Sequence, residues 1–255
     1  MKKRSLLLLP LAAALALSGC SGSDTEPSTE STETSAGSSD TGASQEAAAP
    51  QASAALSTEQ AKSIVTKLAG DSSTVQILDG DSIAASLPQA KAMIEQMEIK
   101  PEKCAEFVTQ QDSWDIDGIN MAVAVLMDET TMASTSYSVA GYEDSSKLEQ
   151  ITEQAKSKDL QGCDTFSMSV AGQEVEASAK ILDVTSDADV TYGTVSTMKM
   201  NGMDVPGTYQ IQGLVGNNAV AVSISASEEE SEADMLKELT DELNAAVAEV
   251  KAAAK

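Results

Sequence analysis

The feature of this chain that most constrains its fold is a period of two among the apolar residues from position 119 onward. Large apolar side chains occupy every other position of one stretch, at Ile119, Met121, Val123, Val125 and Met127. Successive side chains of a β-strand point to opposite faces of the sheet, so this spacing predicts a strand with one buried face. The same spacing returns at residues 166–170 and 220–224. An antiparallel sheet is therefore the expected centre of the fold.

Turn signals separate the remaining strands of this sheet. Residues 135–140 are the predicted hairpin partner of residues 119–127. Asn201-Gly202 favours a tight turn between two strands, because both residues tolerate a positive φ. The other strands are predicted at residues 75–78, 175–184, 194–200 and 208–214.

Helix signals lie before these strands. Ser57 and Gln60 have the spacing of a capping box, and Gly70 is the expected end of the helix that they begin. A second helix is predicted with Pro88 in its first turn, where the missing N–H of proline costs nothing. One face of that helix would carry Met93, Ile94 and Met97.

Two more helices are expected later in the chain. Asp144 is the expected N-cap of a helix that runs to about Leu160, and residues 227–230 form a second capping box. The closing helix has an apolar stripe at Met235, Leu236, Leu239, Leu243, Ala246, Val247 and Val250. The elements together predict an α+β fold: a single domain in which an antiparallel β-sheet has helices packed on one face.

The first residues have the pattern of an export signal. Lys2, Lys3 and Arg4 precede a run of leucine and alanine that is too short to span a bilayer, which takes about 20 residues. The run ends in Leu17-Ser18-Gly19-Cys20, which resembles the lipobox of bacterial lipoproteins. The expectation is a signal peptide at residues 1–19 and a mature chain that begins at Cys20, acylated with diacylglycerol and a fatty acid such as palmitate. An ordinary signal peptide followed by an unrelated cysteine is the alternative.

Residues 20–55 differ in composition from the rest of the chain. They contain mainly Ser, Thr, Ala, Gly, Pro and acidic residues, and after Cys20 no large aliphatic or aromatic side chain until Leu56. Such a segment cannot bury enough apolar area to offset the entropy of ordering it. We expect a disordered tether at residues 20–55 and a folded domain at residues 56–255.

Two cysteines remain if Cys20 carries the lipid. An exported protein folds in an oxidising compartment, so Cys104 and Cys163 are predicted to form one disulfide. Two free thiols or a redox pair are the alternatives. The spacing of the two cysteines is not Cys-x-x-Cys, which would favour redox chemistry.

Composition excludes several classes of function. The chain contains no histidine, so Ser-His-Asp and Cys-His catalysis and imidazole metal sites are excluded. Its formal charge of −24 predicts repulsion from nucleic acids and anionic membrane surfaces. We expect no enzyme activity, no cofactor and no nucleic-acid partner.

Two sequence patterns are compatible with a ligand-binding site, but each is better explained without one. Residues 113–118 partly resemble a calcium loop, but Ala124 stands where the loop's bidentate glutamate belongs, which favours an acidic turn. Methionines outnumber the scarce aromatic residues, and a predicted hairpin carries Met198, Met200 and Met203. Most methionines are expected in the core; an apolar groove or a copper(I) thioether cluster is the alternative.

The order of elements resembles a known family. The matching features are residues 56–60 at the start of the first helix, Pro101-Glu102-Lys103-Cys104-Ala105, a helix that ends before Cys163, residues 214–222 and the long C-terminal helix. They resemble the extracellular sensor domain of mycobacterial PknH-type serine/threonine kinases, which also occurs alone in actinobacterial lipoproteins. The chain departs from the family in having one possible disulfide and Leu160 where a tryptophan is common.

The resemblance implies a sheet flanked by helices, a surface cleft for an unknown ligand and a sensing role without catalysis. No ligand-binding residue carries over from the family to a numbered position of this chain. The predicted function is a lipoprotein held to the cell membrane through acylated Cys20, with an extracytoplasmic sensor-like domain that binds a small ligand or an envelope protein. The alternative is a carrier of lipid or another apolar molecule.

Overall fold

A computed structural model describes residues 54–71, 74–105, 116–128, 133–157, 160, 162–170, 173–200, 202–225 and 231–255. The predicted signal peptide, Cys20 and the tether up to residue 53 lie outside these residues. So do residues 113–115 of the acidic loop, Asn201 and the predicted capping box at residues 227–230.

The described residues form one antiparallel sheet of nine strands, in the order β1-β3-β4-β9-β8-β7-β6-β5-β2. The alternating stretches of the sequence form its strands as predicted, because each has one set of side chains that must leave water. The short β2 was not predicted. The strands are β1 Val75–Asp79, β2 Glu98–Lys100, β3 Ile119–Met127, β4 Ser134–Tyr142, β5 Thr165–Val170, β6 Gln173–Leu182, β7 Val190–Met200, β8 Met203–Val215 and β9 Asn218–Ser225.

The first and third predicted helices form near their predicted positions. The helix α1 (Thr58–Ala69) begins with the capping box of Ser57 and Gln60, in which Gln60 N–H donates to Ser57 Oγ and Ser57 N–H donates to Gln60 Oε1. It ends at Gly70, whose φ of 67° favours glycine. The helix α4 (Ser145–Ser157) follows Asp144, whose Oδ1 accepts from Ser146 N–H.

The other two helices begin at positions that differ from the prediction. The helix α2 (Gly80–Ile94) starts eight residues before Pro88, because Asp79 caps it by accepting from Ser82 N–H; Pro88 therefore lies inside the helix. The helix α5 (Glu232–Ala253) takes Ser231 as its N-cap. No helix among the described residues is long and apolar enough to cross a membrane.

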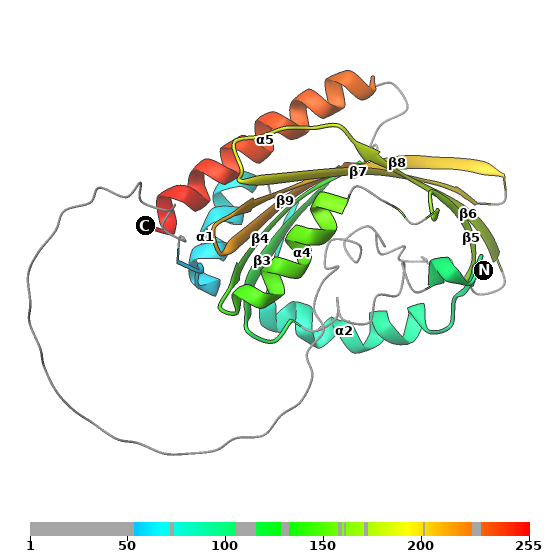
Figure 1. The fold of residues 1–255 in the computed structure, drawn as a ribbon, viewed down its shortest axis with the longest axis horizontal. Helices are drawn as coiled ribbons and strands as arrows, with labels where there is room; N and C mark the ends of the chain where they lie inside the picture. Colours follow the sequence, from blue (N-terminus) through cyan, green and yellow to red (C-terminus); the bar gives the residue numbers. More distant parts are fainter. Residues whose placement is uncertain are drawn as a thin grey trace, which may run out of the picture.

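Helices cover both faces of the sheet, where the sequence predicted one (Figure 1). On the outer face, α1 and α5 bury Ala122, Val139 and Val222. On the inner face, α2 and α4 pack against Met121 and Tyr142 from the same strands. The prediction of one covered face was wrong because it weighed only the large side chains of β3. The alanines between them let a helix approach the second face closely.

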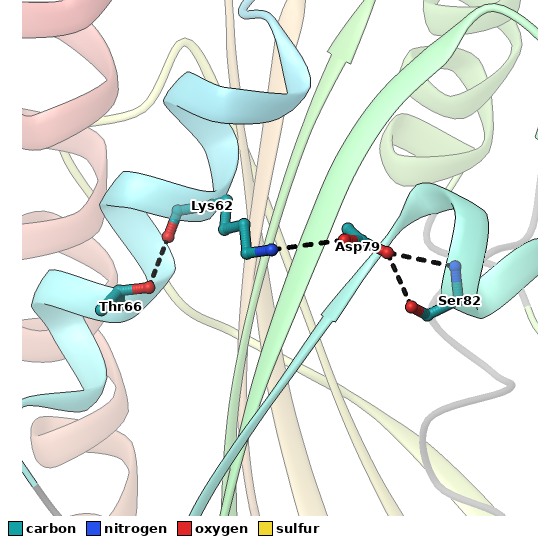
Figure 2. A network of polar contacts seen from close by, with 4 residues as sticks. All are labelled: Lys62, Thr66, Asp79 and Ser82. Atoms are coloured by element: carbon teal, nitrogen blue, oxygen red, sulfur yellow. Dashed lines mark hydrogen bonds and ion pairs between the residues drawn. The ribbon is translucent and has the colours of Figure 1, made fainter.

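A polar network fastens α1 to the edge of the sheet (Figure 2). Asp79, at the end of β1, accepts from Ser82 Oγ at 2.7 Å and from Lys62 Nζ of α1 at 3.3 Å. Thr66 Oγ1 donates to the main-chain oxygen of Lys62 one turn away. The hydrogen bonds from Ser82, and then the charge of Lys62, lower the pKa of Asp79 to about 2.

We predict that Ser82→Ala raises the pKa of Asp79, because the Ser82 hydroxyl is the largest single cause of the lowered value and alanine keeps only the backbone N–H bond to the carboxylate. Since the pKa is lower in the folded chain, the stability that Asp79 contributes is present above its ordinary pKa of 3.8. It is lost as pH falls from there through about 2. Carbon-13 NMR of the Asp79 carboxyl during acid titration measures the shift. An unchanged pKa in Ser82→Ala would contradict the assignment.

Candidate functional site

The inner face of the sheet carries a continuous polar area beside the ends that α2 and α4 cover. The strand register places its residues in three rows that cross β7, β8, β9 and β4. The rows are Tyr192, Gln212, Ala221 and Ser138; Thr194, Gln210, Ser223 and Ser136; and Ser196, Thr208, Ser225 and Ser134. We call these twelve residues the hydroxyl–amide patch.

None of the twelve side chains is charged, in a chain with 40 acidic and 16 basic residues. The outer face of the neighbouring strands differs. There Glu176 and Lys199 lie opposite each other, and Lys180 pairs with Glu232 of α5 at 3.1 Å. The patch is thus neutral by its position in the fold and not through the composition of the chain. All of its residues are half-buried except Ala221, which is buried.

The patch has more hydrogen-bonding groups than it uses. Ser136 and Ser223 share a hydrogen bond of 2.6 Å, and Ser134 and Ser225 share one of 3.0 Å. The remaining polar side chains, which we call the unpaired set, form no side-chain hydrogen bond within the described part of the chain: Ser138, Tyr192, Thr194, Ser196, Thr208, Gln210 and Gln212.

The unpaired set reaches solvent. Among the described residues, every fully buried side-chain nitrogen or oxygen has a hydrogen-bond partner, so the unpaired atoms must lie at the surface. The Tyr192 hydroxyl is neutral near neutral pH at its ordinary pKa of 10.0, and burial raises that pKa further. Hydroxyl and amide groups both donate and accept, so the patch presents mixed neutral hydrogen-bonding capacity across three rows.

Apolar clusters border the patch on two sides. Leu148 and Ile151 of α4 pack over Leu214 at one side. At the other side lies the disulfide of Cys104 and Cys163, with a Cα–Cα distance of 5.5 Å, which confirms the predicted pairing. The side chains packed around the disulfide are Met97, Ile99, Ala105, Phe166, Met168, Val175, Ala177, Met198 and Met200.

The prediction that most methionines lie in the core is confirmed for some of them. Met121, Met168 and Met235 are buried, whereas Met203, at the turn between β7 and β8, is 68% exposed. Met198 and Met200 belong to the cluster around the disulfide.

The expected acidic loop ends in the turn of Asp117 and Gly118, where Lys147 Nζ donates to the main-chain oxygen of Asp117. The described residues contain no group of three or more His, Cys, Asp or Glu side chains placed to hold a metal ion.

An open pocket of about 470 Å³ lies apart from these clusters, where β1 and β4 begin and β3 ends. Its walls combine apolar side chains with polar ones: Thr74, Leu126, Met127, Asp128, Ala133 and Thr135. Its mixed walls and wide mouth differ from the enclosed apolar cavity that a lipid carrier needs.

The start of the domain is held at the opposite end of the strands from the third row of the patch. Asn218, which is fully buried, accepts from Leu56 N–H at 2.8 Å and donates to the main-chain oxygen of Ala54 at 3.0 Å. A β-carbon at Gly141 would collide with the main chain of Leu56. Between Gly141 and Ser134 the strand spans about 24 Å, at about 3.4 Å a residue.

The sequence prediction missed the patch because it followed apolar residues only. A signal was present: serine recurs at positions 134, 136 and 138, and polar residues alternate at 208, 210 and 212. Each run by itself is typical of a solvent-facing strand. Only the pairing of strands that are distant in sequence shows that the runs share one face.

No protein-family model matches the chain, and no curated protein matches it. Among solved structures, the chain is similar to the extracellular domain of PknH from Mycobacterium tuberculosis, with 10% sequence identity and a TM-score of 0.49. That match covers 78% of this chain and 99% of the other. An uncharacterized protein from Mycobacterium smegmatis matches with 15% identity and a TM-score of 0.42, over 75% of this chain and 96% of the other. The first of these domains is of the kind that the sequence motifs resemble.

We predict that Cys104→Ala/Cys163→Ala lowers the free energy of unfolding by about 4 kcal/mol, because the disulfide closes a long loop in the unfolded chain. Urea unfolding of the oxidised protein and of the double variant, followed by circular dichroism, measures the difference. Adding reductant to the double variant is the control and should change nothing. Equal stability of the two proteins would contradict the structural role of the bridge.

Proposed function

We propose that this chain is a lipid-anchored extracytoplasmic domain that binds a ligand on the hydroxyl–amide patch and does not catalyse a reaction. The observation that carries the proposal is the unpaired set: seven neutral polar side chains on one sheet face that reach solvent and form no side-chain hydrogen bond with the described residues. A face of this kind has hydrogen bonds to offer to a ligand. It holds neither a carboxylate pair nor an activated nucleophile.

The anchoring part of the proposal rests on the sequence of residues 1–20. A basic start, an apolar run and Leu17-Ser18-Gly19-Cys20 stand in the order that export and acylation need. The motifs that resemble PknH-type sensor domains favour the same side of the membrane. Two or more acyl chains anchor a protein stably, since each buried methylene contributes about 0.8 kcal/mol.

The position of Asn218 favours an outward orientation of the patch. The tether would join the domain at Ala54 and Leu56, where Asn218 holds the main chain. The third row of the patch lies at the far ends of the same strands. A ligand from the envelope would therefore approach the end of the domain away from the anchor.

Neutral polar binding is favoured over the alternative of an apolar carrier. An apolar ligand on the patch would cover hydroxyl and amide groups without replacing their hydrogen bonds to water, which costs about 1–3 kcal/mol for each group. The apolar clusters beside the patch are filled by their own side chains and by the disulfide.

We expect Cys20→Ser to move the protein from the membrane fraction to the soluble extracytoplasmic fraction, because the thiol is the site of acylation. Metabolic labelling with an alkyne fatty acid, followed by fractionation, measures both effects. Cys104→Ala/Cys163→Ala is the matched control: it removes the other cysteines and should keep both label and membrane association. Label that persists in Cys20→Ser would defeat the anchoring proposal.

A second experiment tests binding on the patch. Amide NMR spectra of the isotope-labelled full chain are recorded with the low-molecular-weight fraction of a host envelope extract. We expect shifts at Ser138, Thr194 and Gln210 and none at Thr197 or Lys180 on the outer face. Shifts spread over both faces, or no shifts at all, would count against the proposed function.

A further inference from the structure

We infer that the ligand of the hydroxyl–amide patch is a neutral oligosaccharide segment of an envelope polysaccharide. The inference rests on the proposed function and names the chemical class that the patch selects. Three properties of the patch carry it: the absence of charge, the mixture of donors and acceptors, and the extended shape.

The absence of charge excludes ionic ligands. A phosphate or carboxylate would meet no lysine or arginine among the twelve residues and would be repelled by the chain's charge of −24. A cation would meet no carboxylate on the patch. Lys199 of β7, and Glu176 and Lys180 of the neighbouring strand β6, lie on the outer face, so these charged side chains are kept off the face that carries the patch.

The mixture of groups suits a polyol. A sugar hydroxyl donates one hydrogen bond and accepts others, and the hydroxyls of Thr194 and Ser196 do the same. The amides of Gln210 and Gln212 each have separate donor and acceptor atoms, which can contact two neighbouring hydroxyls of one ring. A ligand with only acceptors or only donors would leave half of this capacity unused.

The extended shape suits a chain of sugars and not a single small molecule. The second row runs from Thr194 through Gln210 and Ser223 to Ser136. It crosses three strand intervals of about 4.8 Å, or about 14 Å in all, and parallel rows lie on either side. Hydrogen bonds within the Ser136–Ser223 pair hold part of that row in place before a ligand binds.

The strand β7 offers a matched pair of variants. Thr194 lies on the inner face within the patch. Thr197 pairs with Ser178 of β6 on the outer face, where the two hydroxyls are 2.7 Å apart. Valine has the shape of threonine without the hydroxyl, so both substitutions remove one oxygen from the same strand. Only Thr194→Val removes it from the patch.

The test uses the full chain with its disulfide intact and an array of gluco-, manno- and galacto-oligosaccharides. Each neutral sugar is printed beside a sulfated or uronic-acid form, and vesicles of phosphatidylcholine are a separate arm. We expect binding of at least one neutral oligosaccharide, weaker binding of its charged form and no binding of the vesicles. Isothermal titration with the free sugar then gives the affinity.

We expect Thr194→Val to weaken that affinity about fivefold, because it removes one hydroxyl that can bond to the sugar. Gln210→Leu should weaken the affinity more than tenfold, because it removes both a donor and an acceptor. Thr197→Val should bind as the unchanged chain does. Circular dichroism melting confirms that each variant is folded, and Ser138→Ala replaces any that is not.

Three outcomes would overturn the inference. The first is that no neutral oligosaccharide binds, and the second is that charged forms bind more tightly. The third is equal weakening by Thr194→Val and Thr197→Val, which would place the sugar elsewhere. If envelope extract shifts the patch in NMR spectra while every oligosaccharide fails, the sugar class is wrong and the proposed function stands.

Discussion

The structure depends on one antiparallel ladder from β3 through β4, β9, β8 and β7 to β6, which keeps its register except for a shift between Ser196 and Met198 where β7 pairs with β8. Pairing in register sorts alternate residues of each strand into two environments: Val139 and Val222 against α1 and α5, and Ser138 and Ser223 on the inner face. A slip by one residue would exchange these sets, burying hydroxyls in the core and exposing valines. The buried outer face therefore fixes the register, and the register in turn assembles the patch from the alternate positions of the same strands.

Much of this fold was predictable from the sequence because its signals are local. The capping box at Ser57 and the alternation at residues 119–127 each report a structure formed by neighbouring residues. The start of α2 was missed because Pro88 was taken as a boundary, whereas Asp79 supplies the cap nine residues before it. The second covered face was missed for a similar reason: Ala122 and Ala124 contribute little to a count of large apolar residues, yet their small size admits α1.

The patch was beyond sequence reasoning for a different physical cause. Ser136, Thr194, Gln210 and Ser223 form one row, although they come from four strands separated by up to 87 positions. Nothing local marks them as neighbours, since polar residues at alternate positions usually face water. The cysteine pair was predictable despite its separation because two cysteines in an oxidising compartment allow only one partner each.

The distribution of charge makes the patch neutral, and the strand register sets the positions of its residues. The chain is acidic enough to be repelled by anionic surfaces, and its charged strand residues lie on the outer face or at the rim. A ligand on this neutral face would contact hydrogen-bonding groups without a strong local ion pair or repulsion. Its selection would then depend on the positions of donors and acceptors, and the strand ladder sets the main-chain positions of the residues that carry them. If the proposed ligand binds there, the paired strands would hold the main chain under these hydroxyl groups in place, which reduces the entropy lost on binding.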